Sequence, residues 1–277
     1  SRLIGLMVTQ FADPFDIDVA RGVEEVALRH DYRLIMVSAS IDPEREIETA
    51  RELQQRQVDG VIISSSRVGG RYTEILGEIN IPIVLINNHA GGDHVHSVAH
   101  DDYGGARKIA DYLWAQGYRR IAFLGNGRAG RAQSERQRGW SDAMLLANSM
   151  IDVIAFGPNG RMRGGEIGAE RLLELADFRW GTPPDAICCY NDAMAIGALS
   201  VLRRQGLNAP GDIAITGFDD IEMASYTHPP LTTLHQPRYE MGVQAMTIML
   251  QALDEKRRPK EPIAMSMPGE LIVRTSA

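Results

Sequence analysis

Polar and aromatic side chains repeatedly follow the apolar, strand-like runs of this 277-residue chain. In open parallel sheets the loops at the carboxyl ends of the strands converge, and ligands bind there. Amides and carboxylates pair with hydroxyls, and aromatic rings cover the apolar face of a ring, so this mixture suits a small polyhydroxylated ligand. Loop residues are often polar for other reasons, and the convergence of so many loops is what favours a binding site. The candidates from these loops are Gln10, Phe11, Asp13, Phe15, Ser64, Ser66, Asn87, Asn88, Arg161, Asn191, Asp192, Phe218 and Asp219.

Residues 125–130 read Gly-Asn-Gly-Arg-Ala-Gly, a literal dinucleotide-binding pattern directly after a strand-like run. Such a site also needs an acidic residue at the end of the next strand, where it binds the ribose. The next run, Val153 to Phe156, continues into Gly-Pro-Asn without an acid. The sequence therefore does not predict a dinucleotide.

Three histidines, His94, His96 and His100, could suggest a metal site, because alternate residues of a strand share a face. No carboxylate or cysteine stands at ligand spacing beside the first two, so a solvated edge strand is expected instead. The chain also lacks the Gly-x-Ser-x-Gly elbow and the P-loop of common hydrolases and nucleotidases. The sequence predicts no catalysis, no metal and no cofactor.

The composition is that of a soluble globular chain, with 44% hydrophobic and 23% charged residues and no apolar run that could span a bilayer. The net charge of −7 argues against direct binding of nucleic acid, which takes a concentrated basic face. Cys188 and Cys189 are adjacent within an apolar run, so we expect buried thiols in a reducing, cytoplasmic compartment. The chain enters a strand-like run within three residues of Ser1, which predicts a fragment without a leader.

The apolar runs form two quartets separated by helix-length segments, which indicates a duplicated plan. Alternating short strands and helices predict parallel sheets covered on both faces, so each half should form a doubly wound α/β lobe. The expected strands are Leu3 to Val8, Leu34 to Val37, Gly60 to Ile63, Ile83 to Ile86, Ile121 to Leu124, Ile151 to Phe156, Ala186 to Cys189 and Ile213 to Thr216.

Three extended segments are expected to connect the lobes: residues 96–102, 231–236 and 263–273. The last is predicted to be a strand pair broken by Pro268-Gly269. The predicted division assigns residues 1–101 and 236–264 to the N-terminal lobe, and residues 102–235 and 265–277 to the C-terminal lobe.

The segment from Ile215 to Pro237, which contains Gly-Phe-Asp-Asp and Leu-Thr-Thr-Leu-His-Gln-Pro, resembles the signature of the lactose/galactose-repressor (LacI/GalR) family of regulators. The resemblance covers nearly the whole chain, and the order and spacing of its parts make it strong. The other parts are Ile4 to Leu6, Asp13 to Phe15, Ala20 to Glu24, Val58 to Ile63, Asp101 to Ala106, Arg136 with Gly139-Trp140, Asn191-Asp192, and Glu270 to Arg274. It implies two lobes of the periplasmic-binding-protein-like type I, joined by three crossings.

The resemblance also implies roles for single residues. Phe15 matches an aromatic residue over the ligand, Arg136 an arginine that reaches into the cleft, and Asp192 a ligand-binding carboxylate. Without the motif these would be a hydrophobic contact at a helix start, a solvated arginine and a plain N-cap. Asn87-Asn88 stands where relatives often carry Asp-Arg, and the basic loop 159–163 stands where several carry an aromatic residue. These departures leave the ligand open, and the arginines would suit an anionic sugar.

The function implied is effector binding and dimerisation in a LacI-type transcriptional regulator whose helix-turn-helix headpiece is absent from the chain. The expected partners are a small-molecule effector (a sugar or sugar derivative), a second copy of the chain, and operator DNA through the headpiece alone, with no membrane. Helix 192–205 is expected at the dimer interface, since Met194, Ile196, Leu199 and Leu202 exceed the needs of one buried face. An extracytoplasmic sugar-binding protein of a transporter is the alternative, although residues 231–236 and 270–274 favour the regulator.

Overall fold

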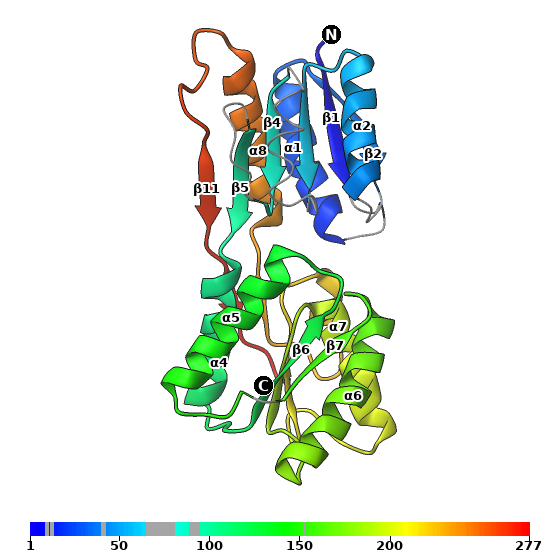
Figure 1. The fold of residues 1–277 in the computed structure, drawn as a ribbon, viewed down its shortest axis with the longest axis vertical. Coiled ribbons are helices and arrows are strands. Elements are labelled where there is room, and N and C mark those ends of the chain that lie inside the picture. The colour runs from blue at the N-terminus through cyan, green and yellow to red at the C-terminus, as the bar shows by residue number, and fades with distance from the viewer. Residues whose placement is uncertain (9–10, 12–13, 40–42, 65–80, 89–94, 152) are drawn as a thin grey trace. The chain divides into compact units, whose positions relative to one another are not determined.

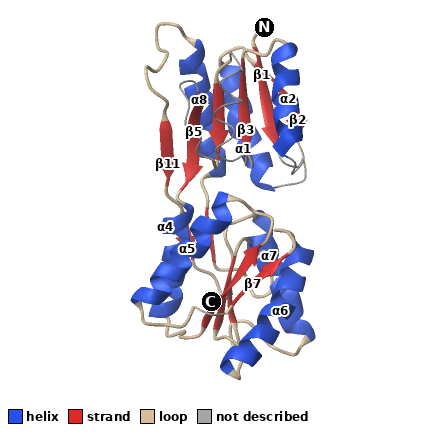
Figure 2. Cartoon of the chain, in the orientation of Figure 1, coloured by secondary structure: helices blue, strands red, loops and turns tan. Residues whose placement is uncertain are grey.

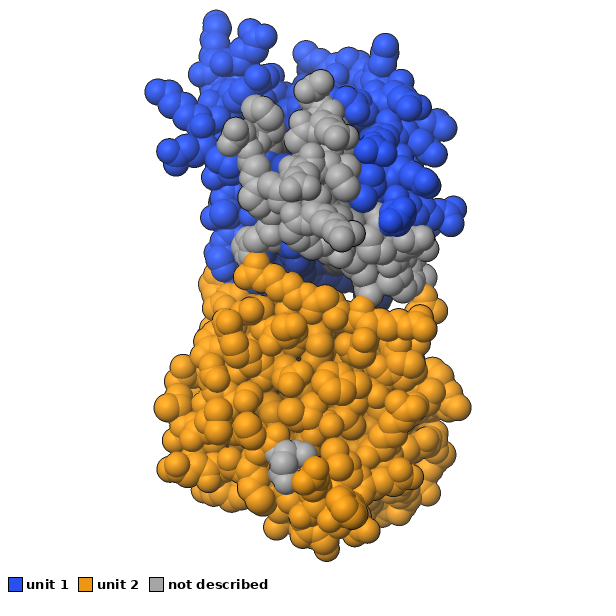
Figure 3. Space-filling view, viewed as in Figure 1, with its two compact units in different colours: residues 1–100, 237–267 blue, residues 101–236, 268–277 orange. Residues whose placement is uncertain are grey.

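The fold was analysed in a computed structural model that describes residues 1–277 except 9–10, 12–13, 40–42, 65–80, 89–94 and 152. The chain divides into two compact units, shown in two colours in Figure 3. Unit 1 contains residues 1–100 and 237–267, and unit 2 contains residues 101–236 and 268–277. The chain therefore passes between the units three times. The boundaries differ from those expected from the sequence by one to three residues.

Unit 1 is built on a six-stranded parallel sheet with the order β11-β5-β4-β3-β1-β2 (Figure 1). Strand β1 occupies the six residues predicted for it, and its apolar side chains are buried. The strands are β1 Leu3–Val8, β2 Arg33–Ser38, β3 Gly60–Ser64, β4 Ile83–Ile86, β5 Val95–His100 and β11 Ala264–Met267. The helices are α1 Pro14–Arg29, α2 Pro43–Gln55 and α8 Arg238–Leu253.

Successive side chains along the strands of unit 1 point to opposite faces of the sheet, so each face carries an apolar core. Ile4, Leu6 and Val8 of β1 face a core built with α1 and α8, whereas Met7 faces a second core with α2. Helices α1 and α8 cross closely, because a Cβ on Gly22 would lie 2.1 Å from the Tyr239 carbonyl oxygen. The helix after the second crossing thus returns to unit 1 as an integral part of its core.

Unit 2 repeats the plan with a four-stranded parallel sheet of order β7-β6-β8-β9, coloured by structure type in Figure 2. Its strands are β6 Ile121–Asn126, β7 Ile154–Gly157, β8 Ala186–Cys189 and β9 Ala214–Thr216. Its helices are α4 Asp102–Ala115, α5 Arg131–Leu146, α6 Met162–Trp180, α7 Asp192–Arg204 and the short 3₁₀ helix η1 Glu222–Ser225. A separate antiparallel pair joins β10 Thr233–His235 to β12 Glu270–Ile272. The duplicated, doubly wound α/β architecture predicted from the sequence is confirmed.

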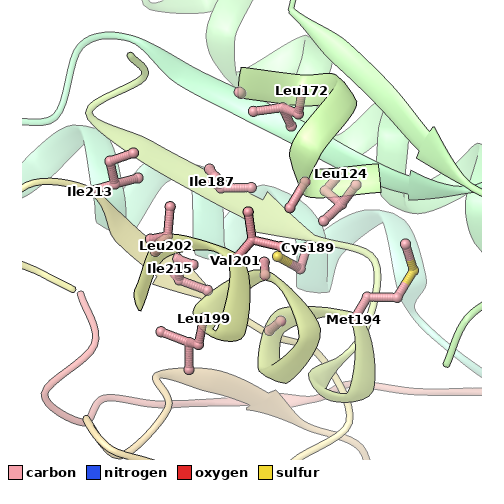
Figure 4. Packing of buried hydrophobic residues seen from close by; sticks show 14 of the residues in the cluster. Leu124, Leu172, Ile187, Cys189, Met194, Leu199, Val201, Leu202, Ile213 and Ile215 are labelled. Carbon is pink, nitrogen blue, oxygen red and sulfur yellow. The ribbon is translucent and has the colours of Figure 1, made fainter. Parts of the chain in front are cut away.

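The two faces of the unit 2 sheet also carry separate cores. Phe123 and Trp140 pack in the core with α4 and α5, and their ring centroids lie 5.5 Å apart. Leu124 faces the other core with α6 and α7, where Met194, Leu199 and Leu202 pack against strand residues (Figure 4). Part of the apolar set of α7 was expected in the core and the rest at a dimer surface, and Met194, Leu199 and Leu202 are core residues. Ile196 alone is half-buried, at the margin of this core.

One expectation about the strands was wrong. Strand β5 is not a solvated edge: it lies between β4 and β11, all six residues are buried, and His96 accepts a hydrogen bond from the Ile263 backbone at 3.0 Å. The cause is β11, which takes the edge position that the local sequence assigned to β5. The two strands expected within residues 263–273 are present as β11 and β12, on either side of Pro268-Gly269, and each pairs within a different unit. Within the described residues, no helix is long and apolar enough to cross a membrane.

Candidate functional site

Arg136 is the buried cation of unit 2. Helix α5 begins after Gly130 and directs Gln133, Arg136 and Trp140 to one face, at the spacing of an amphipathic helix. All three side chains are buried, and Arg136 is only 4% exposed. A buried guanidinium requires hydrogen bonds and opposite charge, and its surroundings show how unit 2 supplies them.

Three elements meet at this guanidinium. Its Nε donates to Asp102 Oδ1 at 2.8 Å, at the start of α4, and its Nη1 donates to the Tyr190 carbonyl oxygen at 2.7 Å, after β8. The guanidinium carbon lies 4.7 Å from the centroid of the Tyr190 ring and 3.8 Å from that of Phe218. The cation therefore stands between two aromatic faces, an arrangement that stabilises positive charge.

Two carboxylates keep Arg136 charged. Asp219 Oδ1 lies 3.6 Å from Nη1, in addition to the contact with Asp102. Burial alone would lower the pKa of Arg136, but Asp102, then Tyr190 and Asp219, outweigh it and raise the pKa above its usual value. The site presents a permanent cation with anionic groups fixed beside it.

The loop after β9 presents Asp219 with an uncommon backbone. Asp219 has φ of 118° and Asp220 has φ of 54°, in the region that non-glycine residues seldom adopt. Two backbone hydrogen bonds attach the loop to the segment 232–234. The Gly217 N–H donates to the Thr232 carbonyl oxygen and the Asp219 N–H donates to the Leu234 carbonyl oxygen, both at 2.9 Å. Local backbone strain of this kind persists where the surrounding contacts determine it, often at functional sites.

Side chains complete the hold on the loop. Gln236 Nε2 donates to Asp219 Oδ1 at 2.5 Å, and Gln236 Oε1 is buried with no hydrogen-bond partner. Asp220 is held by Arg274 at 2.7 Å and by His235 Nδ1 at 3.1 Å. The segment that leads into the second passage of the chain between the units and the segment that follows the third passage therefore both contribute to the placement of the loop.

Asp192 lies under this loop and is fully buried. Its Oδ2 accepts from the Ile221 backbone at 2.8 Å, and its Oδ1 accepts from Thr233 Oγ1 at 2.5 Å. Burial and the neighbouring charge of Asp219 raise the pKa of Asp192 to about 8, although the two donors oppose the shift. The structure thus gives Asp192 a place inside unit 2, and the prediction that it contacts a ligand stays a prediction.

The neighbouring amide and basic residues serve local structure. Asn191 caps α7 by accepting from the Met194 backbone at 2.9 Å, and its Nδ2 donates to the Gly160 carbonyl oxygen at 2.9 Å. Arg161 is exposed, and Arg163 pairs with Glu166 on the surface. Asn126, at the end of β6, accepts from the Arg128 backbone at 3.1 Å. These contacts close the loop that mimics a dinucleotide motif.

In unit 1 the candidate residues hold its own elements together. Ser64 is buried and donates to Asp16 Oδ1 at 2.6 Å, and Phe15 packs in the core beside α8. Asn87 has φ of 57° and accepts from the His100 backbone at 3.0 Å. Phe11 is exposed, and Asn88 is half-buried. Gln10, Asp13 and Ser66 lie outside the described residues.

The structure thus brings together Arg136, Phe218 and Asp219 from the predicted set, with Asp192 and Asn191 beneath and beside them. Sequence reasoning missed Asp102, Gln236 and Thr233 as partners. The sequence did offer a sign of a further role for Asp102. Asp101 already caps α4, so capping does not explain a second acidic residue directly after it. For Thr233 and Gln236 the sequence offered no such sign apart from their place in the family motif. No cluster of metal-ligating side chains occurs in the part of the chain that the structure describes.

Comparisons with known proteins identify the family. Residues 110–277 match the family model described as a periplasmic binding protein-like domain. The transcriptional repressor PurR of Vibrio vulnificus is 31% identical over 277 residues, which cover 99% of this chain and 80% of that protein. The repressor CytR of Escherichia coli is 31% identical over 280 residues, which cover 100% of this chain and 79% of that protein. The chain belongs to the LacI/GalR family of transcriptional regulators.

Solved structures of LacI-family regulators extend the comparison. A CelR regulator in complex with cellobiose has a TM-score of 0.89 at 26% identity and covers all of this chain and 85% of that chain. A LacI-family regulator from Enterococcus faecium with bound ribose has a TM-score of 0.86 at 25% identity, with coverage of 99% and 98%. The chain is thus the effector-binding, periplasmic-binding-protein-like part of a LacI-family repressor, and its relatives are transcriptional repressors rather than enzymes.

Proposed function

We propose that this chain binds a sugar or sugar derivative at the carboxyl edge of its sheets, and that binding changes the arrangement of the two units so as to alter DNA binding by a headpiece. Arg136, Asp219 and Gln236 would supply the polar contacts in unit 2, and Tyr190 and Phe218 would supply aromatic cover. The fixed placement of Arg136 beside Asp219 is the observation that carries the proposal.

The hydrogen-bond inventory around Arg136 supports a ligand with several hydroxyls. The guanidinium has five N–H groups, and the hydrogen bonds to Asp102 and Tyr190 use two of them. Gln236 Oε1 is a buried acceptor without a partner, next to Asp219. A buried unpaired acceptor costs roughly 1–3 kcal/mol, so a ligand hydroxyl that donates to it would gain affinity.

The basic loop of unit 2 gives weaker support to an anionic ligand. Arg128, Arg131 and Arg161 are exposed, and Arg163 is engaged by Glu166. Exposed arginines lose little hydration and contribute little specificity. A neutral sugar is therefore the better candidate, in agreement with the cellobiose and the ribose held by the two related structures.

Dimerisation through unit 2 is the second part of the proposal. Helices α6 and α7 pack closely, and η1 joins their core through Ala224. The exposed apolar side chains on α6 and at η1 include Met162 at 39% exposure, Met223 at 48% and Tyr226 at 79%. Apolar side chains of this size are enriched at subunit interfaces, and we assign these three to the dimer surface.

Glutamate substitutions on the proposed dimer surface test whether it forms the interface, because a buried charge would disfavour association. Met223→Glu combined with Tyr226→Glu should convert a dimer to a monomer in sedimentation velocity at micromolar concentration. Phe178→Glu is the matched control, since Phe178 is 82% exposed at the other end of α6. A parent chain that sediments as a monomer, or a double variant that stays dimeric, would contradict this surface.

Action on DNA is expected to require a helix-turn-helix headpiece, because a net charge of −7 disfavours direct binding of nucleic acid by the units themselves. Such a regulator would act in the cytoplasm, with its operator. Ligand-driven closure would follow from a higher affinity of the ligand for one arrangement of the units than for another. Small-angle scattering with and without a saturating sugar measures that change directly.

The ligand class is tested by a thermal-shift screen. Ribose and cellobiose should raise the melting temperature in a concentration-dependent manner, since a ligand that binds only the folded chain stabilises it. Ribose 5-phosphate and glucuronate serve as the anionic counterparts. If only an anionic sugar raises the melting temperature, the proposed ligand changes from a neutral sugar to an anionic one. The absence of any shift across a wider sugar panel would remove sugars from the proposal.

A further inference from the structure

Asp192 joins three segments of unit 2 that would otherwise be held separately. Its backbone N–H donates to the Phe218 carbonyl oxygen at 2.9 Å, and its carboxyl group bonds Ile221 and Thr233. The first turn of α7, the loop 217–221 and strand β10 are thereby tied to a single side chain. The fit is close: a Cβ on Gly217 would lie 2.0 Å from Asp192 Oδ1. Only glycine at 217 leaves room for this carboxyl group.

The charged groups around Asp192 are mostly of its own sign, since the loop contributes Asp219 and Asp220. The buried Cys189 thiol of β8 adds no positive charge, and burial raises its pKa so that it stays neutral. The nearby cations serve the other carboxylates: Arg136 pairs with Asp219, while Arg274 and His235 pair with Asp220. Among the described residues, no ion pair joins Asp192 to a cation. A fully buried carboxylate without a cation is costly to ionise.

We propose that Asp192 is a positioning residue that acts in its protonated form, tying the loop 217–221 to α7 and leaving the negative charge of the Asp192–Asp219 pair on Asp219, beside Arg136. In this arrangement Asp192 acts on a ligand only through Asp219. Ionisation of Asp192 places a second negative charge under the loop and repels Asp219 from its position. The consequence for effector binding rests on the proposed function, whereas the placement of the proton does not.

The location of the proton is measured by the carbon-13 signals of the aspartate carboxyl groups as a function of pH. The signal missing from Asp192→Asn assigns Asp192. Asp192 should titrate near its raised pKa of about 8. An Asp192 signal that titrates at about pH 4, as an aspartate in a model peptide does, overturns the proposal, whether or not any sugar binds.

The positioning role is measured by titration calorimetry with ribose and cellobiose at about pH 6.5 and about pH 9.5. Asp192→Ala should weaken binding by about tenfold or more, and Asp192→Asn, which resembles the protonated form, should restore affinity to within about threefold. The parent should bind more weakly at the higher pH, and Asp192→Asn should show no such change. Loss of binding in Asp192→Asn with the fold intact would mean that the carboxylate contacts the ligand directly, and would overturn the proposal. If neither sugar binds the parent, the sugar assignment fails and the carboxyl titration still decides where the proton lies.

Discussion

Among the described residues, each unit buries one carboxylate completely at the start of a helix, and the two differ in what surrounds them. In unit 1, Asp16 of α1 accepts from Ser64 at the end of β3. In unit 2, Asp192 of α7 accepts from Thr233 and from a loop backbone, beneath Arg136 and Asp219. The helix N-terminus and the hydroxyl donor are shared features, since both stabilise a buried carboxyl group. The buried ion pair beside Asp192 belongs to unit 2, which is where the charged chemistry of the site is concentrated.

The arginines of the two units give the largest expected contrast. Arg136→Ala should lower the free energy of unfolding by roughly 3–5 kcal/mol, because Asp102 would be left buried without its cation. Arg238→Ala in unit 1 should cost only about 1–2 kcal/mol, because its partner Asp18 is 30% exposed and can be hydrated. Urea denaturation of both variants makes the comparison. Equal costs would show that burial of the pair does not distinguish the units.

The dependence of unfolding free energy on pH tests the second difference between the units, the raised pKa of Asp192. The pKa of Asp192 is raised from its ordinary value of 3.8 to about 8 in the folded chain, so between these pH values the folded state binds a proton that the unfolded state has lost. Stability contributed by this group is therefore full below about pH 4 and is lost progressively as the pH rises to about 8. Asp192→Asn should remove that part of the slope, a difference of about 2 kcal/mol or more at pH 8. Parallel profiles of unfolding free energy for parent and variant would contradict the raised pKa.

The hydroxyl donors of the two carboxyl groups should contribute smaller, similar energies. Thr233→Val and Ser64→Ala each remove one hydrogen bond to a buried carboxyl group, at an expected cost of roughly 1–2 kcal/mol. Thr233→Val should also raise the pKa of Asp192 further, because the Thr233 hydrogen bond lowers it. Thermal unfolding gives the energies, and the carboxyl titration gives the pKa. A cost below about 0.5 kcal/mol at either site would mean that water or another group replaces the donor.

The smallest effect is expected at Arg161. Its side chain is exposed, and Arg161→Ala should leave both the melting temperature and the affinity for a neutral sugar unchanged within error. The matched change at Arg136 should alter both. A marked loss of sugar affinity in Arg161→Ala would move the charged part of the site to the basic loop and would revive an anionic ligand.

Local patterns predicted most of the fold because they report on burial and alternation. Strand β1 followed from its apolar run and helix α7 from the apolar pattern of residues 192–205, both of which involve neighbours in sequence. The position of β5 did not follow, because its edge is covered by β11, which lies more than 160 residues further along the chain. The sequence around β5 contains no pattern that indicates a pairing with a strand so far along the chain.

The site was predicted in part for the same reason. Arg136 stood out through the family motif, and its burial between Tyr190 and Phe218 required knowledge of which loops converge. Asp102 was missed because a helix N-terminus explains an acid without any ion pair. Asp192 was expected to be a ligand-binding carboxylate or a plain N-cap, and only the structure shows it fully buried under the Asp219 loop.

The central claim is that Arg136 and Asp219 hold the effector, and calorimetry on conservative variants tests it most directly. The titrant is the sugar that stabilises the parent most strongly, and the variants are Arg136→Lys and Asp219→Asn, with Arg161→Ala as the control. Each of the first two should weaken binding by about tenfold or more, because a charge-assisted hydrogen bond is lost or misplaced, and the control should bind as the parent does. Affinities within about threefold of the parent for both site variants, with their thermal unfolding intact, would contradict the account.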